Sequence, residues 1–386
     1  MKYVMTLLMI SFLSLSLWVP FPSAQEEKSE IAKVAKSAVL IERDTGTVLY
    51  EKNSHEQLAP ASMTKIMTMI LIMEAIERGQ IKWEDKVRTS EYAASMGGSQ
   101  IFLEPGEEMT VKKMLEGIAI GSANDASVAM AEFIAGSEEN FVKIMNEKVA
   151  TLGLKDTKFQ NPTGLPADDH YSSSHDMAMM AKELLKYPEI TNFTGTYESY
   201  LRENTEKKFW LVNTNKLVRF YDGVDGLKTG FTSEAKYCLT ATAKKGNMRV
   251  IAVVFGVPTP KERNAEVTKM LDYAFNQYTT HPLYEKNTEL MKADISKGEK
   301  KIVSALTSES ISVLTKKGEK VDDVKETVTM EKLKAPVKKG DVIGTLTIKK
   351  DGKVLSESAL VAKSDVDEAS WWQLFKRSFG MFSKIN

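Results

Sequence analysis

The 386-residue chain contains a single cysteine, Cys238, so no disulfide bond can form within it. Its four histidines have no metal-ligand spacing, and the sequence therefore predicts neither a metal site nor a cofactor. Lysine and arginine together number 52, as do aspartate and glutamate, which gives a formal charge of zero. A nucleic-acid-binding protein would carry a basic excess, so the charge balance argues against that class of partner.

The N-terminus has the features of an export signal. Lys2 is followed by residues 4–19, which carry no charge and are almost wholly apolar or hydroxylated, and Pro20 and Pro22 then break the run before Ala24. This pattern predicts a signal peptide over residues 1–24; the alternative is an uncleaved membrane anchor, for which the apolar run is short. In either case the rest of the chain works outside the cytoplasm, and an exported protein without disulfides is typical of a bacterial cell surface.

The length predicts more than one domain. In the first part, residues 25–282, a hairpin is followed by a helix at 62–78, a helical region at 108–185, strands within 224–257 and a closing helix at 262–278. The helix at 62–78 is apolar on all sides, which indicates a helix buried inside a domain. Strands, a helical block and further strands indicate an α+β fold, in which an antiparallel sheet carries helices inserted in mid-chain.

Two further segments follow. Residues 283–365 are rich in lysine and glutamate, alternate in short runs and contain a hairpin turn at 350–353, which predicts a small all-β domain. Residues 366–386 predict an amphipathic helix with aromatic residues every three to four positions and cations beside them: Trp371, Phe375, Phe379 and Phe382, with Lys376, Arg377 and Lys384. Such a helix favours a membrane surface and is too short and too charged to span a membrane; the alternative is docking on its own protein.

Three short motifs occur in order along the first domain: Ser62-Met63-Thr64-Lys65, Ser122-Ala123-Asn124 and Lys228-Thr229-Gly230. Each is weak alone, as a second S-x-x-K at Ser233-Glu234-Ala235-Lys236 shows. The combination is far more specific than any one of them.

Ser62 and Lys65 are three residues apart, so they share one face of the predicted helix. A serine hydroxyl needs a base to become a nucleophile, and lysine can be that base only when it is neutral. Burial lowers the pKa of a lysine, and a second cation such as Lys228 lowers it further. Backbone N–H groups at the helix start would stabilise an oxyanion. The alternative interpretation is a helix-capping serine with an ordinary surface lysine.

The other two motifs have similar pairs of interpretations. Ser122 and Asn124 either cap a helix or relay a proton and hold a substrate carbonyl. Lys228, Thr229 and Gly230 are predicted to open a strand. In one interpretation Gly230 admits a peptide to the strand edge, and its two neighbours bind a terminal carboxylate. In the other they form a turn before a strand.

The ordered motifs resemble the penicillin-recognising serine enzymes. Further stretches are similar to one branch, the low-molecular-mass penicillin-binding proteins that are D-alanyl-D-alanine carboxypeptidases. These stretches are residues 59–65, 121–126, 161–165, 170–172, 176–178 and 224–232. Together with the predicted signal peptide, β domain and terminal helix, they extend the resemblance over nearly the whole chain. Lys236 and Ser173-Ser174 depart from many relatives, and Lys236 could alter the edge of the cleft or a partner surface.

The resemblance implies that Ser62 is acylated by the penultimate D-Ala of peptidoglycan stem peptides ending in D-Ala-D-Ala, with Lys65 as its base. It also implies that Ser122 protonates the departing D-Ala. Removal of this terminal D-Ala would limit cell-wall cross-linking. Backbone N–H groups of Ser62 and Phe231 would form the oxyanion hole. The remaining implied substrate-binding residues are Asn124, Lys228, Thr229, Gly230 and Thr232, with Arg263 assisting.

The resemblance further implies covalent inhibition by β-lactam antibiotics and a place on the outer face of the bacterial cytoplasmic membrane, anchored by the C-terminus. Three alternatives stay open: a β-lactamase, a peptidoglycan endopeptidase and a non-catalytic wall-binding protein. A β-lactamase would need a second base, typically in an E-x-x-L-N motif, and none occurs between Asn124 and Lys228. The branch includes vegetative and sporulation-specific members, and the sequence does not choose between them.

Overall fold

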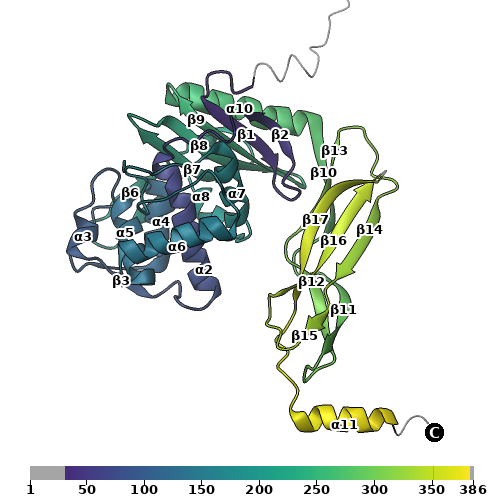
Figure 1. The fold of residues 1–386 in the computed structure, drawn as a ribbon. Coiled ribbons are helices and arrows are strands. Elements are labelled where there is room, and N and C mark those ends of the chain that lie inside the picture. The colour runs from purple at the N-terminus through teal and green to yellow at the C-terminus, as the bar shows by residue number, and fades with distance from the viewer. Residues whose placement is uncertain (1–30, 351, 383–386) are drawn as a thin grey trace, which may run out of the picture.

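The computed structural model describes residues 31–350 and 352–382, with side chains up to Lys376. The predicted signal peptide, residues 1–24, lies outside the described residues, as do the side chains of Phe379, Phe382 and Lys384. Figure 1 shows a larger domain of sheet and helices, a narrower all-β domain beside it, and a separate C-terminal helix at the far end of the β domain. The predicted α+β class and the order of its parts are confirmed.

The larger domain is built on a five-stranded antiparallel sheet in the order β2-β1-β9-β8-β7. Its strands are β1 (Ser37–Glu42), β2 (Val48–Lys52), β7 (Val224–Thr232), β8 (Lys236–Lys245) and β9 (Met248–Val257). The predicted N-terminal hairpin is confirmed, and its first strand pairs with β9 from the other end of the domain. Strand β7 lies at one edge of the sheet.

Both faces of this sheet are buried, because helices pack against each of them. Successive side chains of a strand point to opposite faces, so alternate residues of β9 enter different cores. Ile251, Val253 and Phe255 of β9 face the helical block, whereas Val250, Ala252 and Val254 face α10 (Pro260–Gln277). The main helices of the block are α2 (Lys65–Glu77), α4 (Val111–Gly121), α5 (Asn124–Ala135), α6 (Glu138–Thr151) and α7 (Ser174–Leu184). Shorter elements connect them: β3 (Lys86–Arg88), α3 (Glu91–Ala94), β4 (Glu108–Thr110), α8 (Ile190–Thr194), β5 (Glu198–Leu201), β6 (Phe209–Val212) and α9 (Leu217–Phe220).

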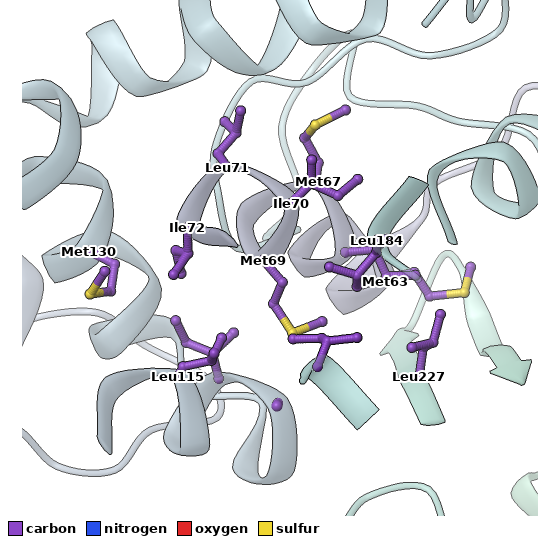
Figure 2. Close-up of a cluster of buried hydrophobic side chains, with 14 of the residues drawn as sticks. Met63, Met67, Met69, Ile70, Leu71, Ile72, Leu115, Met130, Leu184 and Leu227 are labelled. Atoms are coloured by element: carbon purple, nitrogen blue, oxygen red, sulfur yellow. The ribbon is translucent and has the colours of Figure 1, made fainter. Parts of the chain in front are cut away.

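Helix α2 runs through the middle of the block, as its all-round apolar sequence predicts. Figure 2 shows its methionine and isoleucine side chains among residues from neighbouring elements, including Leu115 of α4, Met130 of α5 and Leu184 of α7. The predicted helix start at Ser62 is wrong, because residues Ala61–Thr64 form a separate turn of 3₁₀ helix, η1, before α2 begins at Lys65. Pro60 precedes this turn, and the tighter winding places Ser62 ahead of the α-helix.

The prediction that Lys228-Thr229-Gly230 opens a strand is also wrong, because β7 begins at Val224 and carries the motif in its interior. Asp225 and Gly226, which precede the motif, belong to the strand as well. A Cβ atom on Gly226 would lie 2.6 Å from Oγ1 of Thr194, so close packing against α8 explains this glycine.

The second domain contains β10 (Tyr278–Tyr284), β11 (Glu289–Ser296), β12 (Ile302–Thr307), β13 (Ile311–Lys316), β14 (Lys325–Met330), β15 (Leu333–Lys334), β16 (Val342–Lys350) and β17 (Lys353–Ala362). Strand β10 pairs with β13, so the boundary predicted at residue 282 falls inside β10. The Ser312 hydroxyl donates to Asp44 Oδ2 at 2.6 Å, which joins this domain to the turn after β1.

Helix α11 (Trp371–Phe382) ends the described chain. Trp371 and Trp372 are 67% and 64% exposed, and Phe375 stacks on Trp371 with ring centroids 5.2 Å apart. Among the described residues, no helix has the length and apolar character needed to cross a membrane.

Candidate active site

Ser62 lies in the η1 turn, which is held between two neighbouring segments. Ala61 has φ +47°, a left-handed conformation that is uncommon for a residue with a side chain and is often found at functional sites. A Cβ atom on Gly164 would lie 1.8 Å from the Ala61 carbonyl oxygen, and one on Gly230 of β7 would lie 2.7 Å from the Pro60 carbonyl oxygen. Two glycines therefore allow the backbone to press against both sides of the turn that presents Ser62.

This packing predicts a strong effect of Gly164→Ala. Gly164 has φ +83°, so alanine adds backbone strain as well as a clash with the Ala61 carbonyl group. If Ser62 has the role that the resemblance implies, we expect kcat/KM for D-Ala release to fall by about 10²-fold, because a displacement of about 1 Å in a reacting group can cost that much. Gly153→Ala is the matched control: Gly153 has φ +67°, and a Cβ atom on it would meet no heavy atom within 4 Å. Equal losses in the two variants would contradict the role given to Gly164.

Lys65 is fully buried, and its side-chain nitrogen Nζ contacts three oxygen atoms. Nζ lies 2.6 Å from Asn124 Oδ1, 2.6 Å from the Thr163 carbonyl oxygen and 3.0 Å from Ser62 Oγ. The first two oxygens can only accept hydrogen bonds, so they use two N–H groups. A neutral amine then keeps its lone pair for the third direction, in which the Ser62 hydroxyl can donate.

The electrostatic surroundings favour this neutral form. Burial, and then the positive charge of Lys228, hold the pKa of Lys65 well below its ordinary value, with Asp125 opposing the shift. Burial, and then the charge of Arg263, lower the pKa of Lys228 to about 7. Three basic residues therefore act on one another near Ser62. The charge of Arg263 disfavours protonation of Lys228, and the charge of Lys228 disfavours protonation of Lys65.

The second motif lies where α4 ends and α5 begins. Ser122 is 3% exposed and has φ +64° at the end of α4. Asn124 does not act as a cap: its Oδ1 faces Lys65, and its Nδ2 donates to the Gly97 carbonyl group at 2.7 Å. The capping interpretation of Asn124 is therefore wrong.

The third motif lies on β7, where Gly230 approaches the turn that carries Ser62. Lys228 and Thr229 are buried; Lys228 Nζ donates to the Thr229 carbonyl group at 3.0 Å, and Thr229 Oγ1 donates to Thr214 Oγ1 at 2.8 Å. Phe231 is 53% exposed and stacks on Tyr237. Thr232 Oγ1 accepts a hydrogen bond from the Ala235 N–H in the turn after β7.

Arg263, on α10, is 5% exposed, and its guanidinium group donates to Asn264 Oδ1. Its charge helps to lower the pKa of Lys228. The second S-x-x-K, Ser233 to Lys236, lies in the exposed turn between β7 and β8, so it has no part in the Ser62–Lys65 arrangement.

Three groups near the site had no role in the prediction from sequence. The Thr163 carbonyl group accepts from Lys65, and Thr214 accepts from Thr229. The Asp125 carboxylate accepts from the backbone N–H groups of Ile101 and Leu103 and so holds the segment beside Asn124. Two of these positions lie in the stretches 121–126 and 161–165, which were the available signal; Thr214 had none.

An antiparallel sheet with an inserted helical block, a serine in a tight turn and a buried lysine 3.0 Å from that serine are the features of the penicillin-recognising serine enzymes. Residues 23–259 match the family model described as D-alanyl-D-alanine carboxypeptidase, and residues 278–368 match the one described as penicillin-binding protein 5, C-terminal domain. The chain belongs to the D-alanyl-D-alanine carboxypeptidase family.

Curated relatives and solved structures agree. Over an alignment of 389 positions that covers all of both proteins, the chain is 65% identical to D-alanyl-D-alanine carboxypeptidase DacF of Bacillus subtilis strain 168. It is 35% identical to DacA of Escherichia coli K12, over 88% of this chain and 85% of that one. Penicillin-binding protein 5 of Haemophilus influenzae superposes with a TM-score of 0.67 at 34% identity, covering 87% of this chain and 98% of that one. Predicted family, fold and enzyme class are thereby confirmed.

Proposed function

We propose that Ser62 is the nucleophile of this carboxypeptidase and that neutral Lys65 is its base. The observation that carries the proposal is the arrangement at Lys65 Nζ, which has two obligate acceptors and Ser62 Oγ at 3.0 Å. Lys65 would take the hydroxyl proton as Oγ attacks the carbonyl carbon of the penultimate D-Ala. Backbone N–H groups of Ser62 and Phe231 would stabilise the resulting oxyanion.

Collapse of this intermediate breaks the peptide C–N bond. Ser122 would pass the proton held by Lys65 to the departing nitrogen, so that D-Ala leaves with a neutral amino group and its carboxylate, and an ester remains on Ser62. Water then attacks the ester, Lys65 takes its proton, and the proton returns to Oγ as the shortened peptide is released. Each step uses only the side chains described, water and the peptide.

Lys228 and Thr229 would hold the terminal carboxylate of the substrate, with Thr232 and the charge of Arg263 in support and Asn124 on the substrate carbonyl. Charge-assisted hydrogen bonds of this kind are about twice as strong as neutral ones. Gly230 has no side chain, so a peptide can approach the free edge of β7.

The proposal is tested by incubating the protein with a synthetic peptide ending in D-Ala-D-Ala and measuring free D-Ala. We expect one equivalent of D-Ala per peptide cleaved, and a covalent benzylpenicillin adduct on the proteolytic fragment that contains Ser62. The structure of penicillin-binding protein D2 from Listeria monocytogenes in an ampicillin-bound form, 29% identical to this chain, supports the second expectation. An adduct without D-Ala release would favour the endopeptidase alternative, and fast turnover of penicillin would favour a β-lactamase.

The buried cations make a pH-dependent prediction. Lys65 must be neutral, so the rate of Ser62 acylation by benzylpenicillin should fall as pH decreases through the lowered pKa of Lys65. Lys228→Met removes the neighbouring charge that helps to lower this pKa, so the acid limb of the profile should move to higher pH. Lys244→Met changes an exposed lysine of β8 and should leave the limb in place. An unmoved limb in Lys228→Met would contradict the coupling.

We also infer that the chain is exported and held on the outer face of the bacterial cytoplasmic membrane through α11. The exposed pair Trp371 and Trp372 supports this, because such side chains partition into a membrane interface. Residues 25–386 should co-float with vesicles of phosphatidylglycerol and phosphatidylcholine, and Trp371→Ser with Trp372→Ser should abolish flotation. Flotation that survives both changes would contradict anchoring by this helix.

A further inference from the structure

His170 is a buried histidine beside the nucleophile turn that the chemistry above does not use. It is 8% exposed and ends a loop, residues 160–170, that contacts the start of α2. Both ring nitrogens have partners: Nε2 lies 2.8 Å from Thr64 Oγ1, and Nδ1 lies 3.0 Å from the backbone nitrogen of Gln160. One side chain thus joins both ends of the loop to the nucleophile turn.

These partners determine which ring nitrogen carries the hydrogen. A backbone N–H group can only donate, so Nδ1 accepts from Gln160 and carries no hydrogen. The neutral ring then has its single hydrogen on Nε2, which donates to the Thr64 hydroxyl group. Burial lowers the pKa of His170 to about 4, which favours this neutral form. His170 is therefore a fixed donor to Thr64.

The loop that His170 fastens supplies one of the acceptors of the base. The Thr163 carbonyl group accepts from Lys65 Nζ at 2.6 Å. The side-chain oxygen of Asn161 holds this part of the loop, because it accepts from the backbone N–H groups of Thr163 and Gly164 at 3.1 and 2.7 Å. The loop is thus ordered by its own contacts, and its place beside α2 is set by the hydrogen bonds that join the two.

Thr64 and Lys65 are consecutive residues, so the contact with His170 also constrains the base. Thr64 is completely buried, and its side chain makes no capping hydrogen bond at the start of α2. Its described side-chain hydrogen bond is the one with His170. The next residue, Lys65, bonds to Thr163 of the same loop. Two adjacent bonds therefore fix the distance and the rotation between the base and its acceptor.

We propose that His170 is a positioning residue for the Ser62–Lys65 pair. Through Thr64 it holds the start of α2 against the loop, so that the lone pair of neutral Lys65 stays directed at Ser62 Oγ. Proton transfer needs hydrogen-bond geometry, so a small displacement of the base slows the reaction. His170 itself takes no proton and touches no substrate atom in this role. The inference rests on the proposed function, because it assigns a role within the same site.

The test uses His170→Leu, which fills much of the same volume but removes both hydrogen bonds. We expect the rate constant for Ser62 acylation by benzylpenicillin to fall by about 10- to 100-fold, and kcat for D-Ala release with it. KM should change little, because Lys228 and Thr229 are left in place. At long times the variant should still reach one adduct per chain. Damage to folding alone would instead lower this final yield and leave the rate constant unchanged.

Two further variants assign the path. His170→Gln is the conservative change, because its amide nitrogen can replace Nε2 as the donor to Thr64, and most of the acylation rate should be kept. Thr64→Val removes the acceptor and should slow acylation as His170→Leu does. The double variant, His170→Leu with Thr64→Val, should be no slower than the slower single variant, because both changes break the same bond. If His170→Leu does not fold, Thr64→Val and His170→Gln decide the same question.

His281→Leu is the matched control. Nε2 of His281 lies 3.1 Å from Thr315 Oγ1, a histidine–threonine contact of the same kind, but it joins β10 to β13 in the second domain. This variant should leave the acylation rate, the final adduct yield and D-Ala release unchanged.

The outcomes separate this inference from the proposed function. Unchanged acylation rates in Thr64→Val, or a double variant whose loss equals the product of the two single losses, would overturn the positioning role and leave the carboxypeptidase intact. A lower adduct yield at an unchanged rate constant would overturn it as well. No adduct on Ser62 of the unchanged protein would overturn the proposed function itself.

Discussion

Replacing Ser62 with alanine is expected to lower kcat for D-Ala release by about 10⁶-fold, the order found when another serine enzyme loses its nucleophile. The remaining site still binds the peptide, so KM should change little. The fold should be preserved, because the hydroxyl group is partly exposed and its described contact is with Lys65 alone. Measurements of D-Ala release, penicillin labelling and thermal unfolding on the same preparation provide the test.

The second S-x-x-K supplies the matched control for this experiment. Ser233→Ala removes a serine three residues before a lysine, but from an exposed turn, and should leave D-Ala release and labelling within about twofold of the unchanged protein. If Ser62→Ala kept its penicillin adduct, or if Ser233→Ala lost it, the assignment of the nucleophile would be wrong.

Lys228→Met is expected to have two large effects of opposite kind. Activity should fall about 10²–10³-fold in kcat/KM, because the substrate carboxylate loses a charged partner in a buried site. Stability should rise by on the order of 2 kcal/mol at pH 7, because Lys228 is buried, donates only to the Thr229 carbonyl group and has a pKa of about 7. A methionine of similar length replaces the cation without its desolvation cost.

The sign of this effect can be checked against pH. The pKa of Lys228 is about 7 in the folded protein and has its ordinary value of 10.5 in the unfolded chain. Between these two pH values the unfolded chain therefore binds more protons than the folded protein. The free energy of unfolding of the unchanged protein therefore rises with pH across that window. The advantage of Lys228→Met should be greatest at and below pH 7 and should shrink toward pH 10. Lys244→Met, on the surface, should show no such trend.

Much of the catalytic domain could be predicted from local pattern. Helix α2 was recognisable because its apolar residues surround the helix, and Lys65 within it has no face toward solvent. The hairpin of β1 and β2 and the helices of the block also carry their signals in short windows. Such signals depend only on the periodicity of nearby residues, so these elements can be predicted without knowledge of the tertiary structure.

The failures concern contacts between distant segments. The η1 turn resembles the start of an α-helix in sequence, and the close approach of Gly164 and Gly230 to its two sides comes from distant segments. The glycine at position 226 is explained by the close approach of Thr194 from α8, which the sequence around it does not show. In each case the deciding neighbour lies dozens of residues or more away along the chain.

The candidate site shows the same division. The three motifs were found because their side-chain types are distinctive, and the structure brings Ser62, Lys65 and Asn124 into contact. The Thr163 carbonyl group is a backbone atom, which every residue possesses, so no composition or spacing could single it out. Thr214 becomes relevant only through its contact with Thr229.

The pairing of β1 with β9 determines that the active site can form only after strand β9 has been synthesised. Ser37 lies opposite Phe255, so the central pair of the sheet joins segments separated by more than 200 residues. Contacts at such separation form late in folding, because a long loop must close first. A growing chain that already contains Ser62 and Lys65 but ends before Val257 cannot close the sheet or position β7 against η1. Penicillin labelling of Ser62 would then require a completed sheet, and a chain that ends before Val257 is expected to remain unlabelled.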